Sequence, residues 1–130
     1  MGLDNSIKIR NYEDLNIKYP FYVKTGSFND ELCYWRKCWT IRGEILSCLS
    51  LLKYYSGNDG EIKIAPEDIP NIINVLKKLN NKKSWEASDT IWDWNKYTRR
   101  NIRRCIRNLK WLNSHWKKHP ELEVYFYDSY

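Results

Sequence analysis

The chain has 130 residues, which fits one domain, with 42% hydrophobic and 15% aromatic residues and a formal net charge of +6. This composition excludes an intrinsically disordered chain, and the lack of a long apolar run in the sequence predicts no membrane partner. The positive charge favours an anionic partner.

Alternating apolar and polar residues predict two strands near the start of the chain, over 6–12 and 20–25. Residues 30–55 have the composition and apolar spacing of a long helix, with Asp30 as its N-cap and a glycine-rich turn after it. A short strand is predicted over 61–65. A helix follows over 66–81, with Pro66 in its first turn.

The last third of the chain contains a Trp-rich loop, predicted over 81–94, a helix over 95–118 that Pro120 ends, and a strand over 121–130. The order β-β-α-β-α-α-β predicts a single α+β domain over residues 1–130, with a small, mostly antiparallel sheet and about three helices packed on it. Apolar residues at three- and four-residue spacing form the core stripe of the last helix: Ile102, Cys105, Ile106, Leu109, Leu112 and Trp116.

The same helix carries an excess of positive charge in residues 99–111, RRNIRRCIRNLKW, where no acidic residue occurs. Arginines recur at i,i+4, where like charges repel, so the helix itself does not gain from them. We predict that this side binds an anion, and that the binding residues are Arg100, Arg103, Arg104, Arg107 and Trp111. In the alternative, the arginines pair inside the fold with acidic residues, the candidates being Glu67, Asp68, Asp89 and Asp93.

Two tryptophans and an arginine share one face of the helix predicted over 30–55. At about 100° per residue, Trp39 and Arg42 each lie within about 40° of Trp35. Indole rings can stack on a base while a guanidinium pairs with phosphate, so this face suits a flat anionic ligand. The predicted binding residues here are Tyr34, Trp35, Arg36, Lys37, Trp39 and Arg42. In the alternative, both tryptophans belong to the core and Arg42 lies at its edge.

The four cysteines, at 33, 38, 48 and 105, lie in apolar and otherwise helical settings without a zinc-binding spacing. The start of the chain has no signal-peptide pattern, so we interpret the cysteines as buried free thiols in a reducing cytoplasm. A metal site that combines cysteines with His115 and His119 is the alternative. We predict no metal, no cofactor and, since no catalytic motif is present, no enzyme activity.

Two segments, MGLDNSI over 1–7 and YWRKCWTIRGEI over 34–45, carry a family resemblance. The chain resembles a group of small proteins encoded by bacteriophages and prophages, which share an MGLDN start and a helix containing YWRK. The segments GEIKIAPEDIPNIINVLKKL and VYFYDSY are similar to later parts of those proteins. The resemblance implies a phage accessory protein, acting in the cytoplasm of a bacterial host cell to counter host defence.

From these features we predict a protein that binds and sequesters a small phosphorylated nucleotide signal, such as a cyclic oligonucleotide, without catalysis. One alternative is a nucleic-acid-binding module that uses the basic C-terminal helix. Another is a protein-directed inhibitor of a host defence complex, with Arg and Trp as binding hot spots. We also predict a homo-oligomer, most simply a dimer, that pairs through a terminal strand bearing Tyr125, Tyr127 and Tyr130.

Overall fold

The computed structural model describes residues 4–10, 31–36, 39–49, 61–81 and 96–129. The α+β class is confirmed: a four-stranded antiparallel sheet is combined with three α-helices and one short 3-10 helix, η3, within the described residues. In chain order the elements are β1 (Asp4–Ile9), β2 (Glu31–Arg36), α1 (Trp39–Cys48), β3 (Glu61–Ile64), η3 (Pro66–Asp68), α2 (Ile69–Asn81), α4 (Lys96–Lys118) and β4 (Val124–Ser129).

The main error of the sequence-based prediction concerns β2. Residues 31–36 form a strand, and the helix predicted over 30–55 is confirmed only for α1, which begins at Trp39. Tyr and Trp are good strand formers, and backbone pairing with β1 outweighs an apolar spacing that is equally compatible with a helix. Asp30, the strand predicted over 20–25, residues 50–55 and the loop over 82–94 lie outside the described residues.

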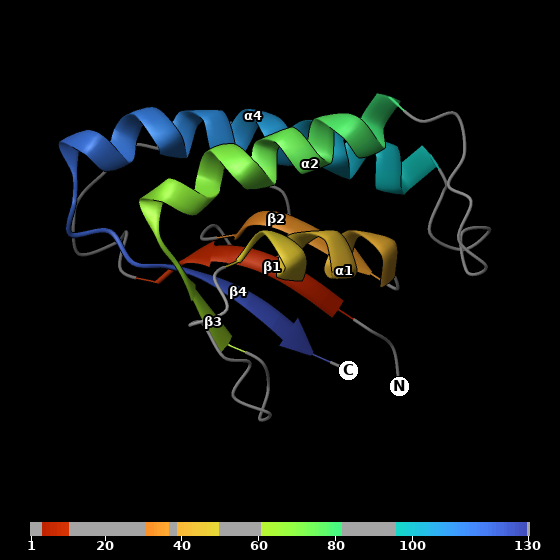
Figure 1. Ribbon diagram of the computed structural model, residues 1–130, viewed down its shortest axis with the longest axis horizontal. Helices are drawn as coiled ribbons and strands as arrows, with labels where there is room; N and C mark the ends of the chain where they lie inside the picture. Colours follow the sequence, from red (N-terminus) through yellow and green to blue (C-terminus); the bar gives the residue numbers. More distant parts are fainter. Residues whose placement is uncertain (1–3, 11–30, 37–38, 50–60, 82–95, 130) are drawn as a thin grey trace.

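The four strands pair in the order β2-β1-β4-β3, with every neighbouring pair antiparallel. Side chains alternate between the two faces, as they must in extended backbone. One face is fully buried at Ile7 and Ile9 of β1 and at Val124 and Phe126 of β4. The two central strands therefore supply the apolar floor on which the helices pack (Figure 1).

A bulge in β2 changes which of its side chains enter the core. Ile7 pairs with Cys33, whereas Lys8 pairs with Glu31, so Leu32 is an extra residue on the β2 side. Both Leu32 and Cys33 are buried as a result. The bulge also pairs Glu31 with Lys8, and Nζ of the lysine lies 3.8 Å from Oε2 of the glutamate.

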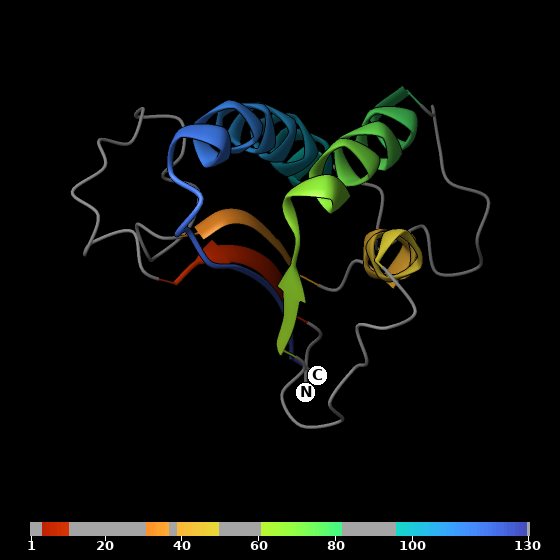
Figure 2. The same cartoon turned by 60° about the vertical axis from the view of Figure 1, so that its left-hand side comes forward.

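α4 and α2 lie side by side over one face of the sheet, and α1 packs against α2 (Figures 1 and 2). The predicted apolar stripe of α4 is confirmed, because each of its members is buried: Ile102, Cys105, Ile106, Leu109, Leu112 and Trp116. α2 contributes a similar stripe of Ile69, Ile72, Ile73, Leu76 and Leu79. The core lies between these stripes and the sheet, which leaves the far side of α4 exposed.

Candidate functional site

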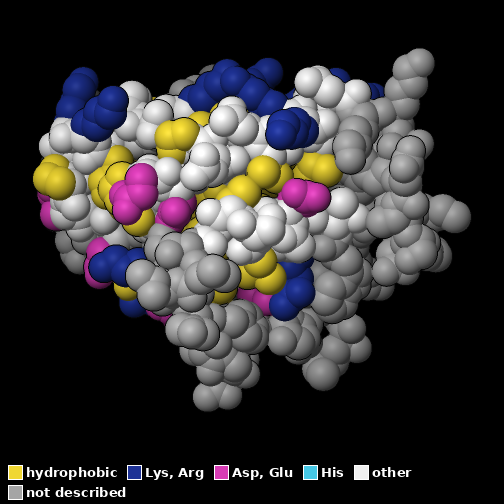
Figure 3. Space-filling model, in the orientation of Figure 1, with side chains coloured by type: hydrophobic (Ala, Val, Ile, Leu, Met, Phe, Trp, Pro, Cys, Tyr) yellow, Lys and Arg dark blue, Asp and Glu magenta, His cyan; other side chains and the backbone are white. Residues whose placement is uncertain are grey.

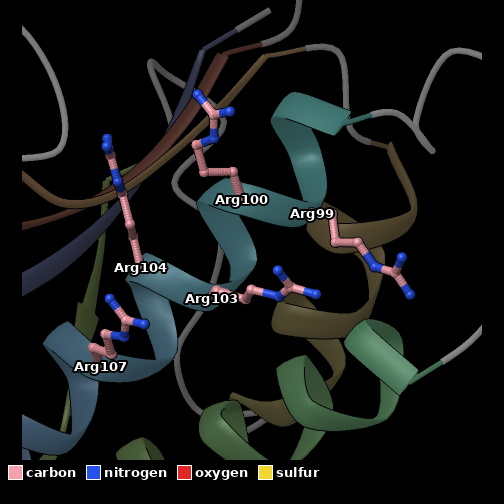
Figure 4. Close-up of a pocket in the computed structure, with 5 residues that line it drawn as sticks. All are labelled: Arg99, Arg100, Arg103, Arg104 and Arg107. Carbon is pink, nitrogen blue, oxygen red and sulfur yellow. The ribbon is translucent and has the colours of Figure 1, made fainter.

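The far side of α4 is strongly basic. None of the 23 residues of α4 is acidic, and Arg100, Arg103, Arg104 and Arg107 are exposed while Arg99 is partly buried. These five arginines line one open hollow of about 480 Å³ (Figure 4). We refer to Arg100, Arg103, Arg104 and Arg107 as the arginine face. As predicted, it points away from the apolar stripe.

Basic side chains continue along α4 beyond this hollow. Lys110, Lys117 and Lys118 are exposed, and at about 100° per residue they fall on the same half of the helix as the arginine face. With a rise of about 1.5 Å per residue, Arg100 and Lys118 are about 27 Å apart along the helix axis. Figure 3 shows Lys and Arg side chains along the upper edge of the molecule, with Asp and Glu side chains below them in that view.

No ion pair among the described residues joins the arginine face to an acidic side chain. Asp68, one of the predicted partners, is buried and accepts a hydrogen bond from the backbone nitrogen of Ala65 at 2.9 Å. Glu67 is exposed, and Asp89 and Asp93 lie outside the described residues. Internal pairing of the arginines therefore has no support from the acidic residues that the structure describes.

The arginine face does not stabilise the helix that carries it. Arg100 with Arg104 and Arg103 with Arg107 are like-charge i,i+4 pairs, each of which costs a few tenths of a kcal/mol, or roughly 0.2–0.5. The first turn of α4 contains no acidic residue, although the helix dipole favours negative charge there. Because the buried stripe packs α4 against the rest of the fold, we expect that the fold does not need the charge of these arginines.

Two asparagines attach the inner side of α4 to β2. Nδ2 of Asn101 donates a hydrogen bond to the carbonyl oxygen of Tyr34 at 3.2 Å, and Nδ2 of Asn108 donates to the carbonyl oxygen of Leu32 at 2.7 Å. β2 lies at the edge of the described sheet, so these side chains bind carbonyl groups that a further strand would otherwise bind. They also fix the rotation of α4 about its own axis.

These two asparagines were not predicted from the sequence. The available signal was their spacing of seven residues, two helical turns, beside the apolar stripe of a helix. Asn is a poor helix former, so its presence there indicates a role in side-chain hydrogen bonding. Which groups Asn101 and Asn108 bind depends on the neighbouring strand, and the sequence analysis predicted a helix for that segment.

A disulfide between Cys33 and Cys105 joins β2 to α4 between the two asparagines, with Cα atoms 4.9 Å apart. The prediction of free thiols is wrong for this pair, because their 72-residue separation gives no sign that strand and helix bring them together. The expectation of a cytoplasmic location is therefore no longer supported by free thiols at these two positions. Neither cysteine of the disulfide is available as a metal ligand. We refer to Asn101, Asn108 and this disulfide as the seam.

The two remaining cysteines carry no further argument about the site. Cys48 is a free thiol on α1, and its partial burial, followed by the nearby Glu44 carboxylate, raises its pKa. At neutral pH it is therefore a protonated thiol rather than a reactive thiolate. Cys38 lies outside the described residues.

The tryptophan and arginine face predicted over 30–55 does not form. Trp35 belongs to β2 and is only 1% exposed, so its ring cannot stack on a ligand. Trp39 and Arg42 belong to α1, so the predicted helical face spans a strand and a helix. Tyr34 is half-buried on β2, and Lys37 and the side chains of Arg36 and Trp39 lie outside the described residues.

Arg42 is bound inside the fold. Its Nε lies 2.9 Å from both carboxylate oxygens of Asp128, and its Nη2 lies 2.8 Å from Oδ2. Asp128 is fully buried at its side chain and also accepts a hydrogen bond from Nδ2 of Asn5 at 2.6 Å. This charge-assisted network occupies the guanidinium, so the alternative that placed Arg42 at the edge of the core describes it better.

Trp111 was predicted on the arginine side of α4 and is instead buried, with 7% of its surface exposed. Its ring stacks on His115, the two ring centroids being 4.5 Å apart. A helical projection places Trp111 about 40° from Arg107 and about 100° from Leu112, the nearest residue of the stripe, so its position on the helix does not explain its burial. The arginine face is thus without this aromatic side chain.

The tyrosines of β4 do not offer a free edge for dimer formation. β4 pairs with β1 on one side and β3 on the other, so the prediction that it provides an edge is wrong. Cations cover the rings of its two described tyrosines. Arg10 Cζ lies 3.9 Å from the ring centroid of Tyr125, and Lys8 Nζ lies 5.2 Å from that of Tyr127. Tyr130 lies outside the described residues.

Comparison of the chain with protein-family models, with curated proteins and with solved structures found no match. Across the described ranges, no helix is both long enough and apolar enough to cross a lipid bilayer. The features of the protein that indicate a function are therefore the geometry and charge of α4.

Proposed function

We propose that the protein binds the phosphate backbone of a nucleic acid along α4, without catalysis. The observation that carries this proposal is the arginine face: four exposed arginines, lining one hollow, that form no ion pair with any acidic residue the structure describes. A guanidinium presents its donors in a planar fork that matches phosphate oxygens, which makes arginine well suited to this partner.

The length of the basic surface favours a polymer over a small ligand. DNA carries one phosphate per strand for about every 3.4 Å of its axis, so the 10 Å or so between Arg100 and Arg107 corresponds to about three phosphates. The exposed lysines at 110, 117 and 118 extend the same surface. A nucleic acid can meet all of these charges at once, whereas one small nucleotide meets only a few.

Sequestration of a small phosphorylated nucleotide remains a prediction with weaker support. The hollow of about 480 Å³ has the size of a ligand site, but the described residues that line it are all arginines. Trp35 and Trp111, which would supply stacking surfaces, are buried. The phage origin, the homodimer and the inhibition of a host complex likewise remain predictions. Light scattering of the free and the nucleic-acid-bound protein measures the oligomeric state directly.

The proposal is tested by fluorescence anisotropy with a labelled DNA of about 20 base pairs, two helical turns, at salt concentrations between about 50 and 200 mM. The four residues of the arginine face, each contacting one phosphate, contribute about −3.6 to the slope of log affinity against log salt, and contacts by the exposed lysines make the slope steeper. The double variant Arg100→Gln/Arg104→Gln should lower the magnitude of the slope by about 1.8 and weaken binding at least about tenfold.

The matched control is Lys63→Glu on β3, which removes the same two units of positive charge from an exposed position on the sheet. It should leave the slope nearly unchanged, because that side chain lies on the face of the sheet away from the helices. Equal losses of DNA affinity in both variants would mean that net charge alone explains the effect, and would contradict the proposal. Tight, salt-insensitive binding of a cyclic dinucleotide, with none of DNA, would favour the small-ligand prediction instead.

A further inference from the structure

We propose that α4 enters the major groove of B-form DNA, with Arg107 facing the base edges and the basic side chains on either flank contacting the two phosphate chains. This inference rests on the proposed function. It adds the form of the nucleic acid, and it assigns base contacts to one arginine and phosphate contacts to the others.

The exposed side of α4 carries its cations in two rows. Figure 4 shows Arg100 and Arg104 extending to one side of the helix, and Arg99 and Arg103 to the other. At about 100° per residue, Lys110 falls within about 20° of Arg103 and extends the second row. The rows therefore run along opposite flanks of one ridge, which Arg100, Arg103, Arg104, Arg107 and Lys110 form. The first row ends before Trp111, which projects between Arg100 and Arg104 but is buried.

Two flanking rows match the geometry of a groove bounded by two strands. An α-helix with its side chains is about 10–12 Å across, and the major groove is about 12 Å wide, so the helix fits between the two phosphate chains. In that position Arg100 and Arg104 reach one chain, while Arg103 and Lys110 reach the other. A single strand offers one phosphate chain and would leave one row without a contact.

Arg107 occupies the centre of the ridge. In helical projection it lies between the row of Arg100 and Arg104 and the row of Arg103 and Lys110, about 20–60° from each member. It is exposed, so its guanidinium can extend toward the floor of the groove. There its fork of donors matches O6 and N7 of guanine, the commonest specific contact in major-groove recognition.

The inner side of α4 is held in a way that suits this task. Asn101, Asn108 and the Cys33–Cys105 disulfide fix α4 to β2 at successive turns, so the arginine face keeps one orientation. Binding then costs less ordering of the protein. Single-strand binders rely on aromatic platforms for base stacking, and the two described tryptophans of α4, Trp111 and Trp116, are buried.

The first experiment compares the full chain with three labelled probes of one sequence: duplex DNA, the corresponding single strand and duplex RNA. We expect duplex DNA to bind at least about tenfold more tightly than either other probe, because A-form RNA has a major groove too narrow for side chains to read. Equal or tighter binding of single strand or RNA overturns the groove inference and leaves the proposed function standing. Binding of none of the three overturns the proposed function itself.

The second experiment separates the ridge from the flanks, using selection from a random duplex library and the salt slope as two readouts. Arg107→Gln should remove the preference for guanine. It should lower the magnitude of the salt slope by less than about 0.9, the value expected for the loss of one phosphate contact. Arg100→Gln/Arg104→Gln and Arg103→Gln/Lys110→Gln should each lower it by about 1.8 and keep that preference.

A third arm tests the contact on the base itself. Replacing guanine by 7-deazaguanine in the selected site removes the N7 acceptor, so wild-type affinity should fall about fivefold or more. The Arg107→Gln variant should show no further loss on that probe. An equal loss in wild type and variant, or a guanine preference that survives Arg107→Gln, overturns the assignment of Arg107. Melting temperatures of all variants check that each one is folded.

Discussion

Arginine side chains occur in two opposite environments in this protein: Arg42 is bound inside the fold, and the arginine face lies on the outer side of α4. The Arg42 guanidinium meets a buried carboxylate on β4, and on the inner side of α4 the asparagines meet backbone carbonyl groups of β2. On the outer side of α4, four arginines repel one another and form no ion pair with the described acidic residues. Polar groups that face the sheet are thus bound by other groups of the fold, whereas the charges on the outer side of α4 have no partner among the described acidic residues.

The largest effect on stability is expected when the partner of Arg42 is removed. Asp128→Ala removes the buried carboxylate that binds both the part-buried Arg42 guanidinium and the Asn5 amide, and should lower the free energy of unfolding by about 3–5 kcal/mol. Denaturant titration measures this loss. Glu61→Ala is the control, since it removes the partner of Arg10 on the surface and should cost at most about 1 kcal/mol. Similar losses in both variants would erase the distinction between inner and outer pairs.

The seam should also contribute strongly to stability. Replacing Cys33 and Cys105 by Ala removes a crosslink between residues 72 apart in sequence and should lower the free energy of unfolding by about 2–4 kcal/mol. Thermal melting with and without a dithiol reductant gives the same comparison for the wild-type protein. Cys48→Ala serves as the control, because that thiol is free. A melting temperature that reduction does not change would show that the seam holds without its disulfide.

A smaller effect is expected from a single hydrogen bond of the seam. Asn108→Ala leaves the buried carbonyl group of Leu32 without its side-chain donor, and should cost about 1–3 kcal/mol. The matched control is Asn74→Ala on α2, an exposed position where Ala is the better helix former, so stability should be equal or slightly higher. If the two variants unfold at the same denaturant concentration, the Asn108 bond does not hold α4 to β2.

The smallest effect on stability should come from the arginine face itself. Arg100→Gln/Arg104→Gln removes a like-charge pair, so the free energy of unfolding should stay constant or rise by a few tenths of a kcal/mol, roughly 0.2–0.5. Differential scanning calorimetry at low salt measures the change. A clear loss of stability would mean that these arginines pair with acidic groups inside the fold, and would remove the main support for a nucleic-acid partner.

Some features were predictable because they depend on local patterns. The apolar stripe of α4 repeats every three to four residues, and its burial follows from that period whatever lies opposite. The exposure of Arg100, Arg103, Arg104 and Arg107 follows in the same way, since they occupy the other side of the helix. The alternation in β3 and β4 likewise predicted strands, because a half-buried strand has a period of two.

Other features depend on contacts between distant segments. The short apolar segment over 31–36 is compatible with a helix or a strand, and only pairing with β1 decides between them. That decision moved Trp35 from a predicted ligand-binding face into the core. Cys33 and Cys105 are far apart in sequence, as are Arg42 and Asp128, so neither pair could be recognised from spacing.

By itself, therefore, the sequence determined the class of fold, the inner and outer sides of α4, and the presence of a basic surface on the outer side. The class of fold follows from the order of the predicted elements, and the other two follow from the periodicity of side chains along a single element. Tertiary structure alone decided which polar groups have partners: Arg42 has Asp128, the asparagines of the seam have carbonyl groups of β2, and the arginine face has none among the described acidic residues. The reason is that a partner is set by distance in space, which the folded sheet and helices fix and the local pattern does not.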